Sequence, residues 1–357
     1  MTQPSILLMA GGTGGHIFPG LAVANYLRTR GWNVAWLGNK NGMEYRLVSA
    51  ADFPFESVDF GGLRGKGLKT KLMLPFNLVR AVIQSWKIMS RLKPDVVLGM
   101  GGYITFPGGI VTKLAGRVLV LHESNSVAGS ANRALASIAR KTLTGFPNTM
   151  KGAEWVGNPI REAFDALAAP SQRYEQRQGR LSILVVGGSL GAAVLNEVVP
   201  EALALMPVDS RPHVIHQAGE KHLADLQRRY AMAGVDADVR AFIDDMPTVY
   251  AQADLVICRS GAMTVSELAA CGVAACLIPF PFAIDDHQTA NARFLADANA
   301  AILLPQAQLN PTDLALMIQN LSRVDLKAMA VRAHELAKPH ATRRVAEVCA
   351  ECAGVSL

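Results

Sequence analysis

Short apolar runs alternate along the chain with longer segments in which apolar residues recur every three or four positions. Such runs are typical of strands buried on both faces, and the longer segments are typical of amphipathic helices. In the first half the runs predict strands at residues 6–10, 33–37, 95–99, 118–121 and 142–144. In the second half they predict strands at residues 182–187, 213–217, 239–243, 254–258, 274–278 and 301–304. The alternation predicts α/β folding in both halves, as two doubly wound, Rossmann-like domains with parallel sheets.

Chain length agrees with two domains, because 357 residues is about twice the usual size of one domain. The Gly-Asn-Pro turn at residues 157–159 and the polar stretch after it indicate the boundary. We therefore expect domains at residues 1–158 and 159–339. A last helix within residues 340–357 can pack back on the first domain or on the second.

Each half opens with a glycine-rich turn between a predicted strand and a predicted helix. The first turn is Gly-Gly-Thr-Gly-Gly-His at residues 11–16, and the second is Gly-Gly-Ser-Leu-Gly at residues 187–191. Glycines let backbone N–H groups approach a phosphate, and the following helix directs the positive end of its dipole at the anion. The sequence therefore predicts two turns that bind phosphate.

The dinucleotide-binding fingerprint is absent from both turns. In the first half, Ile17 stands where the fingerprint needs its third glycine, and residues 37–40 bring no acid for a ribose. The second half fails in the same way after residues 214–218. We therefore do not expect either domain to bind NAD.

Composition limits the classes of partner. With 50% hydrophobic and 18% charged residues the chain is not disordered, and its net charge of +6 indicates an anionic partner. Residues 61–94 hold eight Lys and Arg residues and no acid. From Pro75 onward apolar residues recur there at helical spacing: Phe76, Val79, Val82, Ile83, Trp86 and Met89.

A basic amphipathic helix of this kind is typical of a surface that touches anionic lipid, and we expect it at residues 64–93. The alternative is a sheet-covering helix with a solvated basic face. Nucleic acid is not expected, because basic residues are not interleaved with stacking aromatics.

No membrane-crossing segment is predicted, since the longest uncharged stretch, residues 268–284, is short and broken by Gly272, Pro279 and Pro281. The N-terminus lacks the features of a signal peptide, and five cysteines do not make a disulfide framework, so a cytosolic location is expected. Cys349 and Cys352 form a lone pair that rarely means zinc or redox chemistry.

Ligands of parallel sheets bind beyond the carboxyl ends of the strands. Several motifs occupy those positions in this chain: GGTGGH, GGYITFPGG, HESN, GNPIR, GGSLGA, FIDDM and RSGAMTVSELAACG. In this order, and over nearly the whole length, they closely resemble the MurG family of bacterial glycosyltransferases. These enzymes transfer N-acetylglucosamine from UDP-N-acetylglucosamine to undecaprenyl-diphospho-muramoyl-pentapeptide, lipid I, and so form lipid II in peptidoglycan synthesis.

The resemblance implies an inverting, metal-independent enzyme of the two-domain B type (GT-B), with a cleft between the domains and no cofactor. It implies a peripheral protein on the cytoplasmic face of the cell membrane. The first domain would bind the acceptor and the membrane, and the second the UDP-sugar. An Asp-x-Asp pair, Asp236 and Asp238, precedes a predicted strand and so falls at the edge of the sheet away from the ligand, where we do not expect a metal.

Carried over by motif, the donor site lies mostly in the second half. Ser189 and the start of the helix at residues 262–264 would hold the diphosphate, with Arg161 adding charge. Ile243 would read uracil with its backbone at a strand end. Gln288 and Asn125 would contact the sugar, because an amide both donates and accepts. The full set of expected substrate-binding residues is Thr13, Gly14, Gly15, Asn125, Arg161, Ser189, Ile243, Ala262, Met263, Thr264, Val265, Ser266, Glu267 and Gln288.

Glu267 allows two interpretations. The resemblance assigns its carboxylate to both hydroxyls of the ribose. Its spacing from Thr264 also fits a helix capping box, Thr-x-x-Glu.

The acceptor's 4-hydroxyl needs a base, and His16 is the candidate because an imidazole titrates near neutral pH. The alternatives are Glu123 as the base, or His16 as a ligand of the acceptor diphosphate beside residues 13–15. Two other functions stay open: an isomerase like UDP-N-acetylglucosamine 2-epimerase, and a non-catalytic nucleotide-sugar or lipid-binding module.

Overall fold

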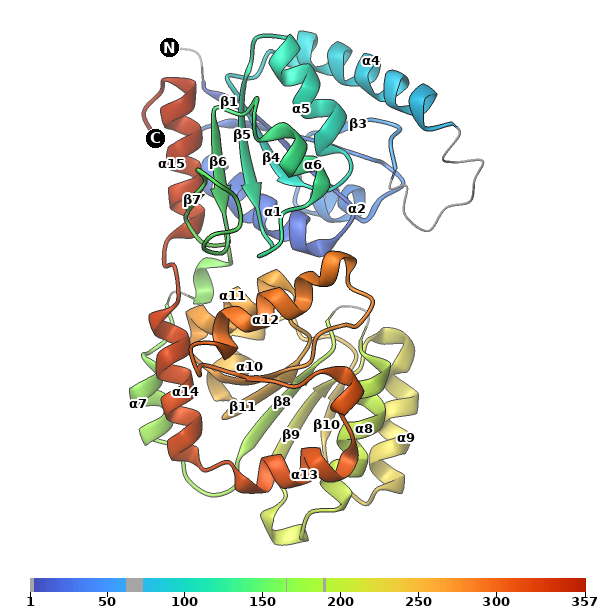
Figure 1. Cartoon of the computed structure of the whole chain (residues 1–357), viewed down its shortest axis with the longest axis vertical. Helices are drawn as coiled ribbons and strands as arrows, with labels where there is room; N and C mark the ends of the chain where they lie inside the picture. Colours follow the sequence, from blue (N-terminus) through green and yellow to red (C-terminus); the bar gives the residue numbers. More distant parts are fainter. Residues whose placement is uncertain (1–2, 62–72, 165, 189–190) are drawn as a thin grey trace. The chain divides into compact units, whose positions relative to one another are not determined.

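The computed structural model describes residues 3–61, 73–164, 166–188 and 191–357, which form two compact units (Figure 1). The first unit comprises Met1–Arg161 and Lys338–Leu357, and the second comprises Glu162–Ala337. The chain therefore leaves the first unit once and returns to it for its last helix. Predictions for Ser189 and for the basic residues Arg64, Lys66, Lys69 and Lys71 fall outside the described residues.

The first unit is built on a parallel sheet, for which the described strands have the order β3-β2-β1-β4-β5-β6-β7. The strands are β1 (Ser5–Ala10), β2 (Asn33–Gly38), β3 (Phe55–Ser57), β4 (Val96–Gly101), β5 (Val118–Glu123), β6 (Lys141–Thr144) and β7 (Glu154–Trp155). The helices are α1 (Gly14–Arg28), α2 (Met43–Ala50), α4 (Leu74–Leu92), α5 (Thr105–Leu114), α6 (Ser130–Leu135) and α15 (Ala341–Ala353).

The second unit repeats the plan, with the described strands in the order β10-β9-β8-β11-β12-β13. Its strands are β8 (Ser182–Val186), β9 (His213–Gln217), β10 (Asp238–Arg240), β11 (Leu255–Cys258), β12 (Ala274–Leu277) and β13 (Ile302–Leu303). Its helices are α7 (Pro170–Glu175), α8 (Ala193–Ala204), α9 (Leu223–Met232), α10 (Met246–Gln252), α11 (Ala262–Cys271), α12 (His287–Ala296), α13 (Pro311–Asn320) and α14 (Arg323–Glu335). Short 3₁₀ turns lie at Glu162–Phe164, Val208–Ser210, Glu220–His222, Ile284–Asp286 and Gln306–Gln308.

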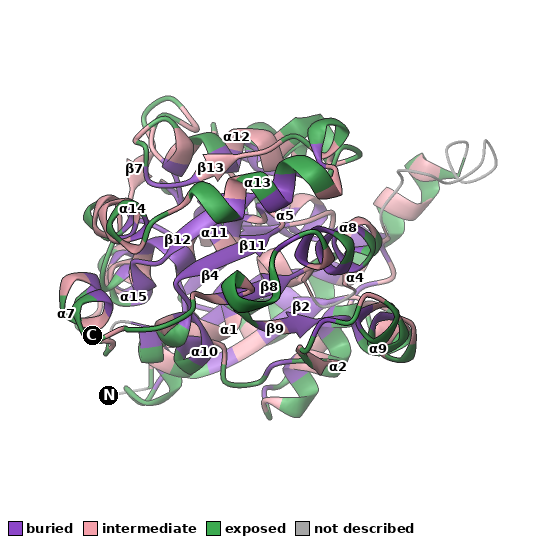
Figure 2. Ribbon diagram, turned by 90° about the horizontal axis from the view of Figure 1, so that it is seen from below, coloured by how far each residue is buried: buried purple, intermediate pink, exposed green. Residues whose placement is uncertain are grey.

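The prediction of two doubly wound, Rossmann-like parallel sheets is therefore confirmed. A strand is found at each predicted position. The central strands were predictable because they are continuous apolar runs buried on both faces (Figure 2). The strand predicted at residues 239–243 is shorter and ends at Arg240. The edge strands β3 and β7 were missed, since three and two residues carry no periodic signal.

Helix α15 contributes to the core of the first unit. Val345, Ala346 and Cys349 are buried in one cluster with residues of β1, β2 and β4. Arg344 adds ion pairs to Glu154 of β7, at 2.9 Å, and to Glu351. Cys349 is thus a packing residue, and burial raises the pKa of its thiol.

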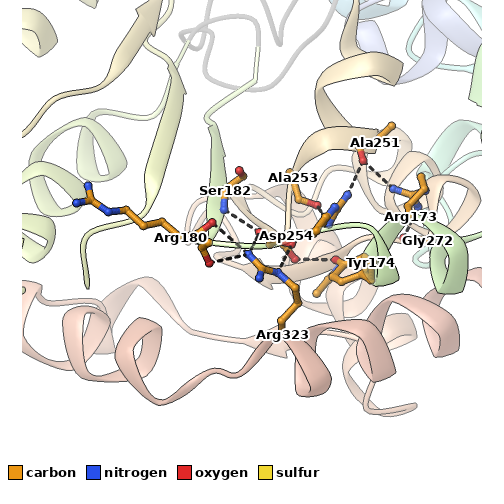
Figure 3. A network of polar contacts seen from close by, with 12 residues as sticks. Arg173, Tyr174, Arg180, Ser182, Ala251, Ala253, Asp254, Gly272 and Arg323 are labelled. Carbon is orange, nitrogen blue, oxygen red and sulfur yellow. Dashed lines mark hydrogen bonds and ion pairs between the residues drawn. The ribbon is translucent and has the colours of Figure 1, made fainter. Parts of the chain in front are cut away.

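A buried carboxylate joins several elements of the second unit (Figure 3). Asp254, which is 1% exposed, accepts from the N–H of Ser182 at 2.8 Å and forms ion pairs with Arg177 at 3.0 Å and Arg323 at 3.2 Å. Tyr174 donates to its carbonyl at 2.7 Å. These bonds tie α7, α14 and the amino ends of β8 and β11 together, at the edge opposite the carboxyl ends of the strands.

Candidate functional site

The first glycine-rich turn joins β1 to α1 and is packed tightly against the loop after β4. Gly102 has φ of 84°, and a Cβ there would collide with the carbonyl oxygen of Gly11. Thr13 is the N-cap of α1, so the N–H groups of Gly14 and Gly15 belong to the first helical turn and have no acceptor within the helix. The predicted residues Thr13, Gly14 and Gly15 therefore present backbone donors at the carboxyl end of β1.

A buried carboxyl group, which no sequence motif indicates, lies beneath this turn. Glu44, on α2, is fully buried and accepts from the N–H of Gly12 at 3.3 Å, the N–H of Asn39 at 3.1 Å and the hydroxyl of Tyr103 at 3.1 Å. Burial and the Glu44 charge both raise the pKa of the Tyr103 phenol, which keeps it a donor. One N–H of the first turn is thus already bonded to a side-chain oxygen of the protein itself.

His16 has a geometry that suits a general base. Its Nδ1 lies 3.2 Å from the carbonyl oxygen of Gly11 and 3.3 Å from the hydroxyl of Thr13. A carbonyl can only accept, so Nδ1 carries the proton and Nε2 carries the lone pair. The Nε2 edge of the ring lies against Gly101, where a Cβ would come within 3.1 Å of Nε2.

Glu123 is bonded as a structural carboxylate. It is 2% exposed and accepts from the N–H groups of Asn125 at 3.0 Å and Gly129 at 2.9 Å, and from the amide of Asn132 at 2.9 Å. These donors hold the loop after β5, which also places Asn125 at the carboxyl end of the sheet. The oxygens of Glu123 are thus already bonded within the protein, which counts against the Glu123 alternative.

The neighbouring His122 connects this loop to the point where the chain leaves the unit. Its ring is fully buried, and its Nε2 donates to the carbonyl of Gly157 at 2.9 Å. Asn158 donates to the carbonyl of Ser124 at 3.0 Å. Burial lowers the pKa of His122, so the ring is neutral beside His16. Two hydrogen bonds thus join the HESN motif to the GNPIR motif.

In the second unit, amides lie beneath the second glycine-rich turn. The amide of Gln217, at the end of β9, donates to the carbonyl of Gly188 at 2.9 Å, and Asn196 donates to the carbonyl of Ala218 at 3.1 Å. Gly191 has φ of 75°, and a Cβ there would collide with the carbonyl of Ala218. The side chains that bond to the described part of this turn are therefore neutral.

Helix α11 begins at Ala262 with Gly261 as its N-cap. Thr264 is consequently the third residue of the helix, and the capping-box interpretation of Thr264 and Glu267 is wrong. The N–H groups of the first turn, from Ala262 to Thr264, have no acceptor within the helix. Val265 is different, because its side chain is fully buried and its N–H donates to the carbonyl of Gly261 at 3.0 Å.

The other expected donor-site residues also lie at or beyond the carboxyl ends of strands. Ser266 and Glu267 are partly exposed on α11, one and two residues beyond Val265. Ile243 is buried in the loop between β10 and α10, three residues beyond the end of the strand rather than at it. Arg161 is exposed, and it is the last residue of the first unit before the chain enters the second.

Gln288 and Arg259 form a second bonded group at this edge. The Oε1 of Gln288, in the first turn of α12, accepts from the N–H of Phe280 at 2.9 Å. Arg259, which follows β11, donates to the carbonyls of Ile278 and Pro279, each at 3.1 Å. Sequence reasoning missed Arg259, although a lone basic residue directly before the Ser-Gly helix start was a usable signal.

The Asp-x-Asp pair lies at the opposite edge of the sheet. Asp236 and Asp238 line a cavity of about 250 Å³ at the amino ends of β8, β9 and β10. Asp238 is bonded to Arg240, with its Oδ2 at 2.5 Å from Nη2. Among the described residues, no group of three His, Cys, Asp or Glu side chains has the arrangement of a metal site.

Helix α4 has two apolar faces. One, with Ala81, Ile88 and Met89, is buried in the core of the first unit. On the other, Phe76 is 70% exposed and Trp86 is 45% exposed, with Val79 and Ile83 between them on the same face. Within the predicted residues 64–93 a helix with an exposed and a buried apolar face is therefore found at Leu74–Leu92, and Met89 lies on its buried face. Helix α4 covers the sheet, as expected for a sheet-covering helix. It also exposes apolar side chains, which a lipid-contacting surface would need.

Basic residues flank this exposed face of α4. Arg80 and Arg91 pair with Asp59 and Glu56, each at 2.5 Å, and Lys87 is exposed. Within the described part of the chain, no helix is long and apolar enough to cross a membrane.

Two Rossmann-like units with backbone donors at their strand ends are typical of a nucleotide-sugar glycosyltransferase. Comparison with known protein families gives the same class. Residues 6–144 match the N-terminal domain of glycosyltransferase family 28, and residues 182–346 match its C-terminal domain. This chain belongs to glycosyltransferase family 28.

The names of three similar proteins state one particular activity or enzyme. The chain is 78% identical over 357 residues, all of both chains, to the UDP-N-acetylglucosamine--N-acetylmuramyl-(pentapeptide) pyrophosphoryl-undecaprenol N-acetylglucosamine transferase of Polynucleobacter asymbioticus. It is 59% identical over 356 residues, again all of both chains, to the protein of the same name from Cupriavidus metallidurans. The crystal structure of Acinetobacter baumannii MurG is 40% identical, with a TM-score of 0.87 over 98% of this chain and 99% of that one.

Proposed function

We propose that this chain transfers N-acetylglucosamine from UDP-N-acetylglucosamine to the 4-hydroxyl of the muramoyl sugar of lipid I, forming lipid II. The observation that carries the proposal is full-length identity of 78% to a transferase of that name. An isomerase or a binding module would not account for such identity along both units.

His16 is the proposed general base. The bond between its Nδ1–H and the Gly11 carbonyl would orient the ring, and Nε2 would take the proton from the acceptor hydroxyl as the oxygen attacks carbon 1 of the sugar. Attack opposite the UDP inverts the configuration at that carbon. Glu123 is the less favoured candidate, because its oxygens already accept from three donors of the protein.

The leaving UDP would be held in the second unit. The first-turn N–H groups of α11 would stabilise the diphosphate, and an aligned helix dipole contributes about 0.3–2 kcal/mol. Ser189, Ser266 and Arg161 are proposed as further diphosphate contacts, Glu267 as the ribose ligand, and Ile243 as the uracil contact. Asn125 and Gln288 are proposed to contact the sugar.

We expect transfer to continue in excess chelator, because this account uses helix N–H groups where other enzymes use a cation. Complete loss of activity in EDTA, with recovery on adding manganese or magnesium, would contradict it.

The first unit would also contact the membrane, as a peripheral protein at the cytoplasmic face. Support comes from the exposed row Phe76, Val79, Ile83 and Trp86 beside basic residues. Replacing Phe76 and Trp86 with Ser should weaken cosedimentation with anionic vesicles at every salt concentration, because apolar burial is not screened. Replacing Lys69, Lys71 and Arg80 with Gln should weaken it only at low salt. Equal binding by wild type and both variants at low salt would move the membrane contact elsewhere.

One assay separates the transferase from the alternatives. Purified protein with UDP-N-acetylglucosamine should release UDP only after a lipid I analogue is added, and the product should carry the transferred sugar. Conversion of the UDP-sugar without an acceptor would favour an isomerase. Binding with no turnover under any acceptor would favour a non-catalytic module.

A further inference from the structure

Arg259 is a half-buried cation whose bonds all go to neutral oxygens. Beyond the carbonyls of Ile278 and Pro279, it donates to Oε1 of Gln306 at 2.7 Å, and its guanidinium carbon lies 5.4 Å from the centre of the Phe280 ring. Burial lowers the pKa of its guanidinium from the ordinary value. Its described bonds therefore join the start of the segment after β12 to Gln306, and none of them goes to a carboxylate.

These bonds fix the segment that leads from β12 into α12. Within that segment Asp285 and Asp286 have φ of 53° and 50°, in the left-handed region that such residues seldom adopt. Consecutive residues of this kind persist only where their surroundings determine the backbone. Arg259 holds the start of the segment by two carbonyls and by the face of Phe280.

The end of the segment is held by α12 itself. Phe280 offers a backbone N–H, which can only donate, so the oxygen of the Gln288 amide must be the acceptor in their bond. The Nε2 group of Gln288 therefore supplies its two donors to whatever lies beyond. One helical turn later, the amide of Asn291 donates to the carbonyl of Ser260 at 3.2 Å. Helix α12 is thus bonded to Ser260, just before the start of α11, and to Phe280, in the segment after β12.

We propose that Arg259 is a positioning residue that fixes residues 279–286, so that Gln288 presents its amide donors, and not its oxygen, to the transferred sugar. Gln288 then recognises an oxygen acceptor, a hydroxyl or the acetamido carbonyl. The inference rests on the proposed function, since it takes a UDP-sugar as the ligand of this edge.

Calorimetric titration with UDP and with UDP-N-acetylglucosamine tests the proposal, because only the second ligand carries the sugar. We expect Arg259→Met to weaken binding of UDP-N-acetylglucosamine about tenfold and binding of UDP by less than about twofold. Gln288→Met should give the same selective loss. The double variant should lose no more than Gln288→Met alone, because both changes act on one contact.

Two further variants serve as controls. Arg259→Lys keeps the charge but cannot bridge the two carbonyls and Gln306 together, so its loss should fall between wild type and Arg259→Met. If Arg259→Met does not fold, Arg259→Lys carries the same comparison of the two ligands. Arg293→Met removes an exposed charge from α12 and should match wild type for both ligands.

Parallel weakening of UDP and UDP-N-acetylglucosamine by the Arg259 variants would overturn the inference, since the guanidinium would then contact the diphosphate directly. Additive losses in the double variant would also overturn it. Failure of the wild type to bind either ligand would instead refute the proposed function.

Discussion

Both units contain a strand, a glycine-rich turn and a helix in this order, yet the groups beneath the two turns differ. Under the first turn lies the buried carboxylate of Glu44, bonded to the N–H of Gly12, and His16 closes the turn. Under the second lie the amides of Gln217 and Asn196. The side chains beneath the two turns thus differ in kind, a carboxyl group in one unit and amides in the other. The backbone motif alone therefore does not say which turn receives the anionic donor.

The comparison assigns proton transfer to the first unit, and His16→Ala tests this with the largest expected effect. We expect kcat to fall about 100- to 10,000-fold because the general base is lost, with a melting temperature close to wild type. The control is Glu123→Gln, which should lower the melting temperature because an acceptor of buried N–H groups is replaced, while folded protein keeps most of its kcat. A large kcat loss in Glu123→Gln with an unchanged melting temperature would make Glu123 the base instead.

Ribose binding in the second unit is tested by Glu267→Ala. Losing two hydrogen bonds to a charged group should cost on the order of 3 kcal/mol of transition-state stabilisation, as measured by kcat/KM for the donor. Because Gly261, and not Thr264, caps α11, the melting temperature should stay near wild type. A collapsed melting temperature with normal kinetics in the remaining folded protein would leave Glu267 a structural residue.

The groups beneath the turns should differ in their contribution to stability. Glu44→Ala leaves two backbone N–H groups and the Tyr103 hydroxyl without their acceptor, and should lower the free energy of unfolding by about 2–3 kcal/mol. Gln217→Ala leaves one carbonyl without its donor and should cost about 1 kcal/mol. Urea unfolding of both variants measures the two costs. Equal losses would mean that the carboxylate and the amide play the same structural part.

Each unit also buries a neutral histidine, and the next prediction concerns the pH dependence of stability. Burial lowers the pKa of His216 to about 3, whereas an unfolded histidine titrates near 6.5. Between the folded and unfolded pKa values the unfolded state therefore binds more protons than the folded state. The contribution of His216 to the free energy of unfolding is thus fully present above about pH 6.5 and is lost as the pH falls toward 3. We expect His216→Gln to reduce the stability difference between pH 7.5 and pH 5 by about 2 kcal/mol. An unchanged difference would mean that His216 is not neutral when folded.

Much of the fold was predictable because each central strand is a continuous apolar run, as in β1, β8 and β11. The edge strands β3 and β7 were not, since they are short and their pairing is decided by the strands beside them. The motifs placed the predicted residues at the strand ends of each unit, because the ends of parallel strands share one edge of a sheet.

The environment of those residues was not predictable. Two of the groups that Glu44 bonds, in Gly12 and Tyr103, are distant in sequence, and nothing local marks Glu44 as buried. The Thr264 and Glu267 spacing was ambiguous until Gly261 was seen as the N-cap. The bond between Gln288 and Phe280 depends on a left-handed backbone at two aspartates, which no periodicity indicates.

The central claim, that the second unit holds UDP and the first does not, is tested most directly by UDP calorimetry on Gly15→Ala and Gly261→Ala. Both glycines stand at helix starts where a methyl fits, with the nearest described atom 3.7 Å away at Gly15 and 3.9 Å away at Gly261. Both variants should fold normally while a methyl covers the N–H groups of one helix. The account predicts that Gly261→Ala weakens UDP binding about tenfold or more, while Gly15→Ala binds UDP like wild type and transfers more slowly. Normal UDP binding by Gly261→Ala together with loss of binding by Gly15→Ala would contradict it.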